Sequence, residues 1–329
     1  MKASLLAFIC IVLLSLPLAA QDTIATQQQP DIYLVELKDG STIMGTLVSE
    51  DVQQLVLQTK SMGTVTIPRS SIKSARLIDS GSFVKGEYWF DNPNETRYLI
   101  GPSAFCLEKG EGYYQNLYLV VQSFNVGVTD QVTLGGGFEI ISILTGSGLP
   151  AFFITPKIGF EVTPRLHLGA GALYANMTVI DDDLHFGVAY GLATYGTTNN
   201  NVTLGAGWAY KSYRSYYQYS YSPNGTSTVR HFREGGFSEL PIITLSGMAR
   251  PKKRFAVTTE NWIMPVRQPN YSTATVTQSY QAFFSYGMRF MGEKISVDFG
   301  LLNHKDIASD VFVLGLPYVD FVVKFGRHK

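Results

Sequence analysis

Apolar and polar positions alternate along most of this chain, and the alternating segments become longer after Arg97. Strict alternation is typical of a β-strand, because successive side chains point to opposite faces. Before Arg97 the segments are short and are separated by turn-like residues such as Lys38-Asp39-Gly40. After Arg97 they reach about 10 residues, the length that a tilted strand needs to cross a membrane. The pattern predicts an all-β chain with two regions of different kind.

The region before Arg97 predicts a small five-stranded barrel over residues 31–78. Its expected strands are 32–37, 42–48, 55–59, 64–67 and 72–78. The pattern Val35-x-Leu37-x-Asp39-Gly40-Ser41-x-Ile43-x-Gly45-x-Leu47 resembles the first motif of Sm-like and SH3-like small barrels. Sm proteins bind RNA, but the export signal described below places the module away from RNA. We therefore expect a periplasmic docking module with a protein partner, followed by a linker at 79–96.

The region 97–329 predicts a 12-stranded antiparallel up-and-down transmembrane β-barrel. The connections between its segments alternate between short turns, such as 163–164 and 291–293, and longer loops, such as 265–279 and 303–315. That alternation is typical of outer-membrane barrels, and an even strand number puts both ends on the short-turn, periplasmic side. The twelve expected strands are 97–106, 113–126, 131–141, 151–162, 165–174, 183–196, 201–211, 236–248, 254–264, 280–290, 294–302 and 316–325.

One face of each long segment is apolar, and the other is rich in Gly and Ala. Val202, Leu204 and Trp208 alternate with Thr203 and Gly205. Between 184 and 192 the even positions are the apolar ones, which predicts that they face outward. A soluble β-sandwich would also alternate, but its solvated face would carry Lys, Glu and Thr. Aromatic residues sit near the ends of the apolar stripes, as girdle residues do at membrane boundaries: Tyr174, Trp208, Tyr210, Tyr280, Tyr286 and Tyr318.

Two further stretches carry a family resemblance. The strand 317–325, which ends on Phe325, resembles the C-terminal strand of outer-membrane barrels, although four residues follow its aromatic end. The stretches 97–104 and 112–116 resemble uncharacterised outer-membrane β-barrel proteins of Bacteroidetes-type bacteria. These resemblances imply an outer-membrane location, lipid contact and insertion by the barrel-assembly machinery. They imply no activity.

The N-terminus reads as an export signal, and composition excludes several functions. Lys2, an apolar run and Ala19-Ala20 predict a signal peptide over 1–20, and a disordered leader follows at 21–30. Cleavage leaves Cys106 alone, so no internal disulfide can form. Lys+Arg and Asp+Glu number 26 each, and this balance argues against a nucleic-acid partner.

Charged and polar side chains are expected inside the barrel. Charges of both signs in a narrow barrel need partners, which favours a salt-bridged interior. A solute pathway lined by mixed charge is the functional alternative. The inward set predicted from alternation is Glu139, Lys157, Glu161, His167, His185, Lys211, Glu260, Arg289, Asp298, Asp320 and Lys324.

Catalytic, metal and cofactor sites are not indicated. A lipid hydrolase needs a serine, a histidine and an orienting polar residue together. His167 and His185 are candidates, but no matching serine is evident. The histidines lack metal-ligand spacing, and Asp181-Asp182-Asp183 is expected to be a solvated loop tip. We therefore expect no enzyme and no cofactor.

The stretch 212–235 is expected to be a long outer-surface loop. Tyrosine offers a large contact area at low entropy cost, so the loop could contact a carbohydrate or a protein. The alternative is that the flanking strands extend beyond the bilayer and that the tyrosines pack on each other there. The functional hypotheses are a passive pore for small solutes or a structural envelope protein, then a surface adhesin, then a membrane-embedded hydrolase. The tyrosines are Tyr213, Tyr216, Tyr217, Tyr219 and Tyr221.

Overall fold

The computed structural model describes two compact units, Met1–Gly81 and Ser82–Lys329, which we treat separately. The expected signal peptide, the leader 21–30 and the loop Asp181-Asp182-Asp183 lie outside the described residues. The described residues are 31–78, 82–84, 86–146, 150–177, 184–220, 227–270, 275–304 and 315–326.

The first unit contains a five-stranded antiparallel sheet in the order β4-β3-β2-β1-β5. Its apolar core consists of Val35, Leu55, Leu57 and Ile67. A Cβ at Gly45 would lie 2.7 Å from the Gln58 carbonyl oxygen, so β2 and β3 pack too closely there for a larger residue. The strands are β1 (Ile32–Leu37), β2 (Thr42–Glu50), β3 (Gln54–Thr59), β4 (Gly63–Pro68) and β5 (Ile72–Ile78), with a 3₁₀ turn at Arg69–Ser71.

The second unit is a closed 12-stranded antiparallel barrel, as the alternation predicts. The short hairpin β6 (Phe83–Val84) and β7 (Glu87–Tyr88) precedes it. Strand β20 pairs with β8 and closes the cylinder. The strands of this sheet are β8 (Glu111–Leu117), β9 (Val121–Thr129), β10 (Val132–Glu139), β11 (Phe152–Thr163), β12 (Leu166–Asn176), β13 (His185–Gly196), β14 (Asn200–Ser220), β15 (Ser227–Phe237), β16 (Ile242–Lys252), β17 (Phe255–Asn270), β18 (Thr275–Met291), β19 (Ile295–Asn303) and β20 (Leu316–Gly326).

The two ends of the barrel differ in their connections. At the short-turn end, residues 130–131, 164–165, 197–199, 253–254 and 292–294 join successive strands. Strand β8 begins and β20 ends at this same end. At the long-loop end, helix α2 (Ile141–Thr145) lies in the connection from β10 to β11. Across the described part of the chain, no helix has the length and apolar character to cross a membrane.

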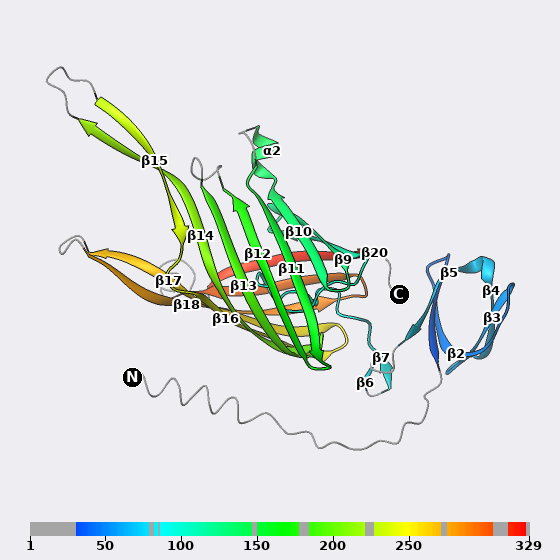
Figure 1. The fold of residues 1–329 in the computed structure, drawn as a ribbon. Coiled ribbons are helices and arrows are strands. Elements are labelled where there is room, and N and C mark those ends of the chain that lie inside the picture. Colours follow the sequence, from blue (N-terminus) through cyan, green and yellow to red (C-terminus); the bar gives the residue numbers. More distant parts are fainter. Residues whose placement is uncertain are drawn as a thin grey trace, which may run out of the picture. The chain divides into compact units, whose positions relative to one another are not determined.

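The rim at the long-loop end is uneven (Figure 1). Strand β14 has 21 residues, and its outer half pairs with β15, the thirteenth strand of the sheet. The hairpins β14–β15 and β17–β18 reach well beyond the rest of the rim in Figure 1. The described residues of the stretch 212–235 thus belong to a paired hairpin, so the expectation of a loop was wrong and the alternative of extended flanking strands was right.

The first two predicted barrel strands were also wrong. Residues 97–106 form no strand of the wall. The predicted strand 113–126 is divided between β8 and β9 by a tight turn. Tyr118 and Leu119 adopt positive φ angles of 55° and 63° there, and the Asn116 side chain accepts a hydrogen bond from the Leu119 amide at 2.9 Å. The strand number was right because these two errors cancelled.

The outer wall of the barrel is apolar. Leu134, Leu168, Leu204 and Phe299 are all exposed on alternate positions of their strands. Tyr174, Trp208, Tyr280 and Tyr286 are exposed as well, as expected of girdle residues. Tyr318 does not belong with these girdle residues: its side chain is 1% exposed and faces the lumen, as the alternation of its strand with Asp320 and Lys324 on the inner face predicts.

Candidate functional site

Residues 90–107, here called the luminal segment, lie inside the barrel. They join the β6–β7 hairpin to β8, and most of them are buried. The Arg97–Pro102 bridge and the bond from the Tyr98 amide to the Gly101 carbonyl (2.9 Å) form a tight turn at residues 98–101. The segment contains no regular element, so its backbone polar groups must find partners on the wall.

Glu260 of β17 binds the tip of this turn. Its Oε2 accepts hydrogen bonds from the amides of Leu99 and Ile100, and its Oε1 accepts one from Gly101, each at 2.9 Å. The indole of Trp262 donates to Oε1 at 2.6 Å. Four N–H donors thus surround one buried carboxylate, which is the way a fully desolvated charge is stabilised.

Arg289 of β18 forms the second wall contact. Its guanidinium pairs with Asp298 of β19 through two hydrogen bonds of 2.8 and 2.7 Å. It also donates to the carbonyl oxygen of Tyr98 at 2.7 Å and to that of Asn94. Both charged side chains are 0% exposed. The ion pair therefore lies beneath the luminal segment, out of contact with water.

Lys157 of β11 holds the other flank of the turn. Its ammonium donates to the carbonyl oxygens of Thr96, Ser103 and Phe105 at 3.1, 3.0 and 2.5 Å. An ammonium has three donors, so all of them are engaged by the luminal segment.

Arg97 is a charged residue of the luminal segment that contacts the wall. Its guanidinium pairs with Asp320 of β20 and also donates to the Leu99 carbonyl oxygen. The Tyr318 hydroxyl donates to Asp320 at 2.9 Å. Charges on both the segment and the wall are thus neutralised across their interface.

A further charged group lies near the short-turn end. Lys324 of β20 is 3.5 Å from Glu95 and 3.2 Å from Glu111. Glu95 belongs to the luminal segment and not to a spanning strand. Burial raises the pKa of Glu95 to about 7, against the opposing effect of Lys324, and Glu111 and Asp91 raise it further. Glu95 therefore changes charge near neutral pH.

Glycines on the inner face make room for the luminal segment. A Cβ at Gly159 would lie 2.3 Å from the Ala104 carbonyl oxygen, and one at Gly169 would lie 3.3 Å from the Ala104 Cβ. The Ala104 amide donates to the Thr194 hydroxyl at 2.9 Å. The richness in Gly, used above as a sign of a membrane barrel, is explained in part by this close packing.

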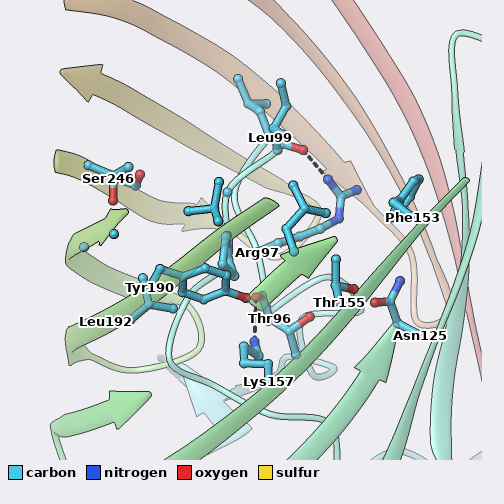
Figure 2. A pocket seen from close by; sticks show the side chains of 18 of the residues that line it. Thr96, Arg97, Leu99, Asn125, Phe153, Thr155, Lys157, Tyr190, Leu192 and Ser246 are labelled. Atoms are coloured by element: carbon cyan, nitrogen blue, oxygen red, sulfur yellow. Dashed lines mark hydrogen bonds between the residues drawn. The ribbon is translucent and has the colours of Figure 1, made fainter. Parts of the chain in front are cut away.

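A cavity of about 360 Å³ lies between the tip of the luminal segment and the long-loop end. Leu99, Ile100 and Pro102 of the segment contribute to its lining, and Figure 2 shows Leu99 there with several wall residues. The wall contributes mainly apolar side chains, with several uncharged polar ones among them. The wall residues that line the cavity include Asn125, Phe153, Thr155, Leu173, Val188, Tyr190, Leu192, Ile242, Thr244 and Trp262.

The structure separates the predicted inward residues into three groups. Lys157, Glu260, Arg289, Asp298, Asp320 and Lys324 are buried and contact the luminal segment, directly or through a paired charge. Glu139 binds the amides of Ser142 and Ala151 at the long-loop rim, and Lys211 is exposed. Glu161 and His167 lie at the short-turn end, 3.9 Å apart, where the His167 ring packs on Phe105.

His185 was predicted to face the lumen, and this prediction was wrong. In β13 the inner positions are Val188, Tyr190 and Leu192, which line the cavity, so the odd positions face outward. His185 bonds the exposed Tyr174 hydroxyl at 2.9 Å through Nδ1. The prediction failed because the lumen is apolar at this level, so the more apolar face of β13 is the inner one.

The hydrolase hypothesis finds no catalytic geometry among the described residues. Ser212 is the cross-strand neighbour of His185, but it is buried and no hydrogen bond joins the two side chains. His167 likewise has no serine partner in that part of the chain. The described residues also hold no cluster of three His, Cys, Asp or Glu side chains that could bind a metal ion.

The side chains of the tyrosine-rich hairpin lie outside the described residues. The backbone of Tyr213, Tyr216, Tyr217 and Tyr219 belongs to β14, and Tyr221 is not described at all. The surface-contact hypothesis thus stays a prediction.

Sequence reasoning missed the luminal segment itself. Pro102 was the available signal, because proline cannot donate to a sheet ladder and is rare in the interior of a wall strand. The second signal was the large number of charges on inward positions, which need partners that the wall alone does not supply.

No protein-family model matches the sequence, and no curated protein matches it. Among solved structures, the NanC porin is 8% identical, with a TM-score of 0.34 over 67% of this chain and 98% of that one. The Pseudomonas putida toluene transporter TodX is 9% identical (TM-score 0.33; 67% and 90% covered). The Acinetobacter baumannii outer membrane protein Omp33 is 10% identical (TM-score 0.32; 66% and 96% covered). Likeness of this degree assigns no activity to the chain.

Proposed function

We propose that this protein is an outer-membrane β-barrel that conducts a small solute, and that the luminal segment is a plug that moves to open the path. The observation that carries the proposal is the chemistry of the contact between plug and wall. The wall binds the plug chiefly through charges and hydrogen bonds, including those of Glu260, Arg289 and Lys157.

Polar contacts of this kind can be exchanged for contacts with water. Moving the plug would hydrate Lys157, Glu260, Arg289 and Asp320 together, so the vacated lumen would become a water-filled path of mixed charge. An apolar plug would instead leave a dry surface behind. The arrangement therefore supports a gated conduit better than a permanent structural core.

The proposed location rests on the outer wall and on the chain ends. Exposed Leu, Phe and Trp side chains around the barrel suit acyl chains. The barrel strands begin and end at the short-turn end, which faces the periplasm in barrels of this type. We place the N-terminal module in the periplasm on this ground.

A disulfide between plug and wall tests the gate. Ala104→Cys with Gly169→Cys places two Cβ atoms about 3.3 Å apart, close to the range of about 3.5–4.5 Å for disulfides. A Cys106→Ser background removes the competing thiol. In planar bilayers we expect the oxidised chain to be silent and the reduced chain to show the single-channel openings of the Cys106→Ser parent.

Equal conductance before and after reduction would refute plug movement. Silence of the parent chain as well, at saturating protein, would refute the conduit and favour a structural role. The single variants Ala104→Cys and Gly169→Cys are matched controls, because neither can form the bridge.

A further inference from the structure

The lumen cavity, here called the chamber, has a lining that restricts the class of ligand it can bind. Its volume of about 360 Å³ lies at the lower end of the range for small-molecule sites. Leu173, Val188, Leu192, Ile242 and Trp262 provide apolar surface from β12, β13, β16 and β17. A chamber of this size and lining suits a compact molecule that is mostly apolar.

Charged ligands find no free partner in the chamber. Arg97 and Lys157 are the charged residues among the described lining (Figure 2). All three donors of the Lys157 ammonium are bound to backbone carbonyl oxygens. The Arg97 guanidinium is paired with Asp320, and its Nε, which has no hydrogen-bond partner, is fully buried and out of reach of a ligand. An ionised ligand would lose its hydration without gaining an available counter-charge.

One corner of the chamber is polar. Asn125 of β9 and Thr155 of β11 flank Gly135 of β10, and Figure 2 shows their side chains next to each other. A Cβ at Gly135 would lie 2.0 Å from Asn125 Oδ1 and 2.4 Å from Thr155 Oγ1, so both oxygens converge over the glycine. Neither side chain makes a hydrogen bond to a described residue, and each can both donate and accept one.

We infer that the chamber binds an uncharged, largely apolar small molecule whose single polar end, a hydroxyl or carbonyl group, is bound by Asn125 and Thr155. The inference deepens the proposed function, because it names the class of solute for the same lumen. The polar end would lie at the β9–β11 corner, and the apolar body would face the opposite wall, where Trp262 lies.

The fluorescence of Trp262 can report binding in the chamber. The chain has three tryptophans, so Trp89→Phe with Trp208→Phe leaves Trp262 as the only fluorophore of its kind. We choose 4-bromobenzyl alcohol as the probe, because bromine quenches indole fluorescence at close range. The full chain is studied in detergent micelles with its plug in place. We expect saturable quenching of Trp262 by this alcohol.

Partition of the probe into the micelle needs a matched control. The chain with Trp89→Phe and Trp262→Phe keeps only Trp208, which is exposed on the outer wall. Its quenching should rise without saturation and should not respond to changes in the chamber.

The corner variants test recognition. Thr155→Val together with Asn125→Leu should raise the apparent Kd of the alcohol about tenfold, since two hydrogen bonds are lost. The Kd of 4-bromotoluene, which lacks the hydroxyl, should change less than about twofold. Thr244→Val, the same kind of change elsewhere in the chamber, should leave both values unaltered. Thr155→Val alone, which is nearly isosteric, serves if the double variant does not fold.

Several outcomes would overturn the inference. Unsaturable quenching by both neutral probes would show that the chamber does not bind. Saturable quenching by 4-bromobenzoate at lower concentration than the alcohol would show a charged ligand, and equal Kd values in the corner variants would exclude the corner. The oxidised disulfide chain separates the two proposals, because it should bind the alcohol without conducting.

Discussion

Side chains alternate between two faces of the strands in both units. The residues on the buried face, however, differ in chemistry between the units. In the small module, the alternate positions Val35, Leu57 and Ile67 bury an apolar core. In strands β18 and β19 of the barrel, the buried positions carry Arg289 and Asp298, while Met288 and Phe299 face outward. Alternation therefore reports that a strand has two faces, and the surroundings decide which face is inside. Four measurements would test or sharpen this contrast.

The largest effect is expected from breaking the buried ion pair of the barrel. Arg289→Met leaves the Asp298 carboxylate buried without its partner, which costs about 3–5 kcal/mol. The loss should appear as a lower midpoint of urea unfolding in micelles. Adding Asp298→Leu should recover much of it, because a well-packed apolar pair can replace a buried ion pair. Failure of the second change to recover stability would show that the carbonyl contacts to the luminal segment dominate.

The outer faces of the two units should respond differently to charge. Leu204 on the barrel is 57% exposed and Val52 in the module is 94% exposed. Leu204→Lys should cost about 2–4 kcal/mol near the bilayer midplane. Val52→Lys should stay within about 0.5 kcal/mol, because that side chain already faces water. Unfolding from lipid vesicles measures both, and equal small effects would contradict a lipid-facing wall.

Neutralising Glu260 should loosen the tip of the luminal segment. Glu260→Gln keeps the shape of the side chain but replaces one of its two acceptor oxygens by an NH2 group, so part of the set Leu99, Ile100 and Gly101 loses its acceptor and the rest keep an uncharged one. We expect a loss of about 1–3 kcal/mol in the local opening free energy of these amides. Hydrogen exchange measures that loss residue by residue. Unchanged protection would mean that the turn is held by packing alone.

The smallest effect concerns pH and Glu95. Burial raises the pKa of Glu95 to about 7, so the folded state binds this proton more tightly than the unfolded chain does. The corresponding stability is present at acid pH and is lost as pH rises through about 7. The luminal segment should therefore exchange more slowly at pH 5 than at pH 8. Glu95→Gln should remove the part of this difference that exceeds the intrinsic pH dependence of amide exchange.

Alternation predicted most of the barrel but could not tell lipid from an apolar cavity. It gave the correct faces for Leu204, Leu168 and Asp298, where the inner wall meets a charged or small partner. It failed in β13, because Val188 and Leu192 are apolar on account of the cavity they line. Hydrophobicity marks contact with any dry surroundings, so a strand beside an apolar cavity gives a misleading signal.

Pro102 argues locally against a wall strand, but the structure of the luminal segment could not be predicted from local sequence, because it depends on distant side chains. Its amides and carbonyls are satisfied by Glu260, Lys157 and Arg289, which lie 52 to 195 positions away along the chain. The turn at Tyr118 and Leu119 was missed for a different reason. Both residues adopt a backbone conformation that usually selects Gly or Asn, and neither is present there.

The pairing of β8 with β20 bears on how such a molecule can be assembled. The luminal segment directly precedes β8, and β20 follows the other barrel strands in chain order. A wall that closes between its first and last strands can wrap around the segment as the seam forms. No chain end then has to be threaded through a finished ring, so insertion into the bilayer and enclosure of the segment can be completed in one event.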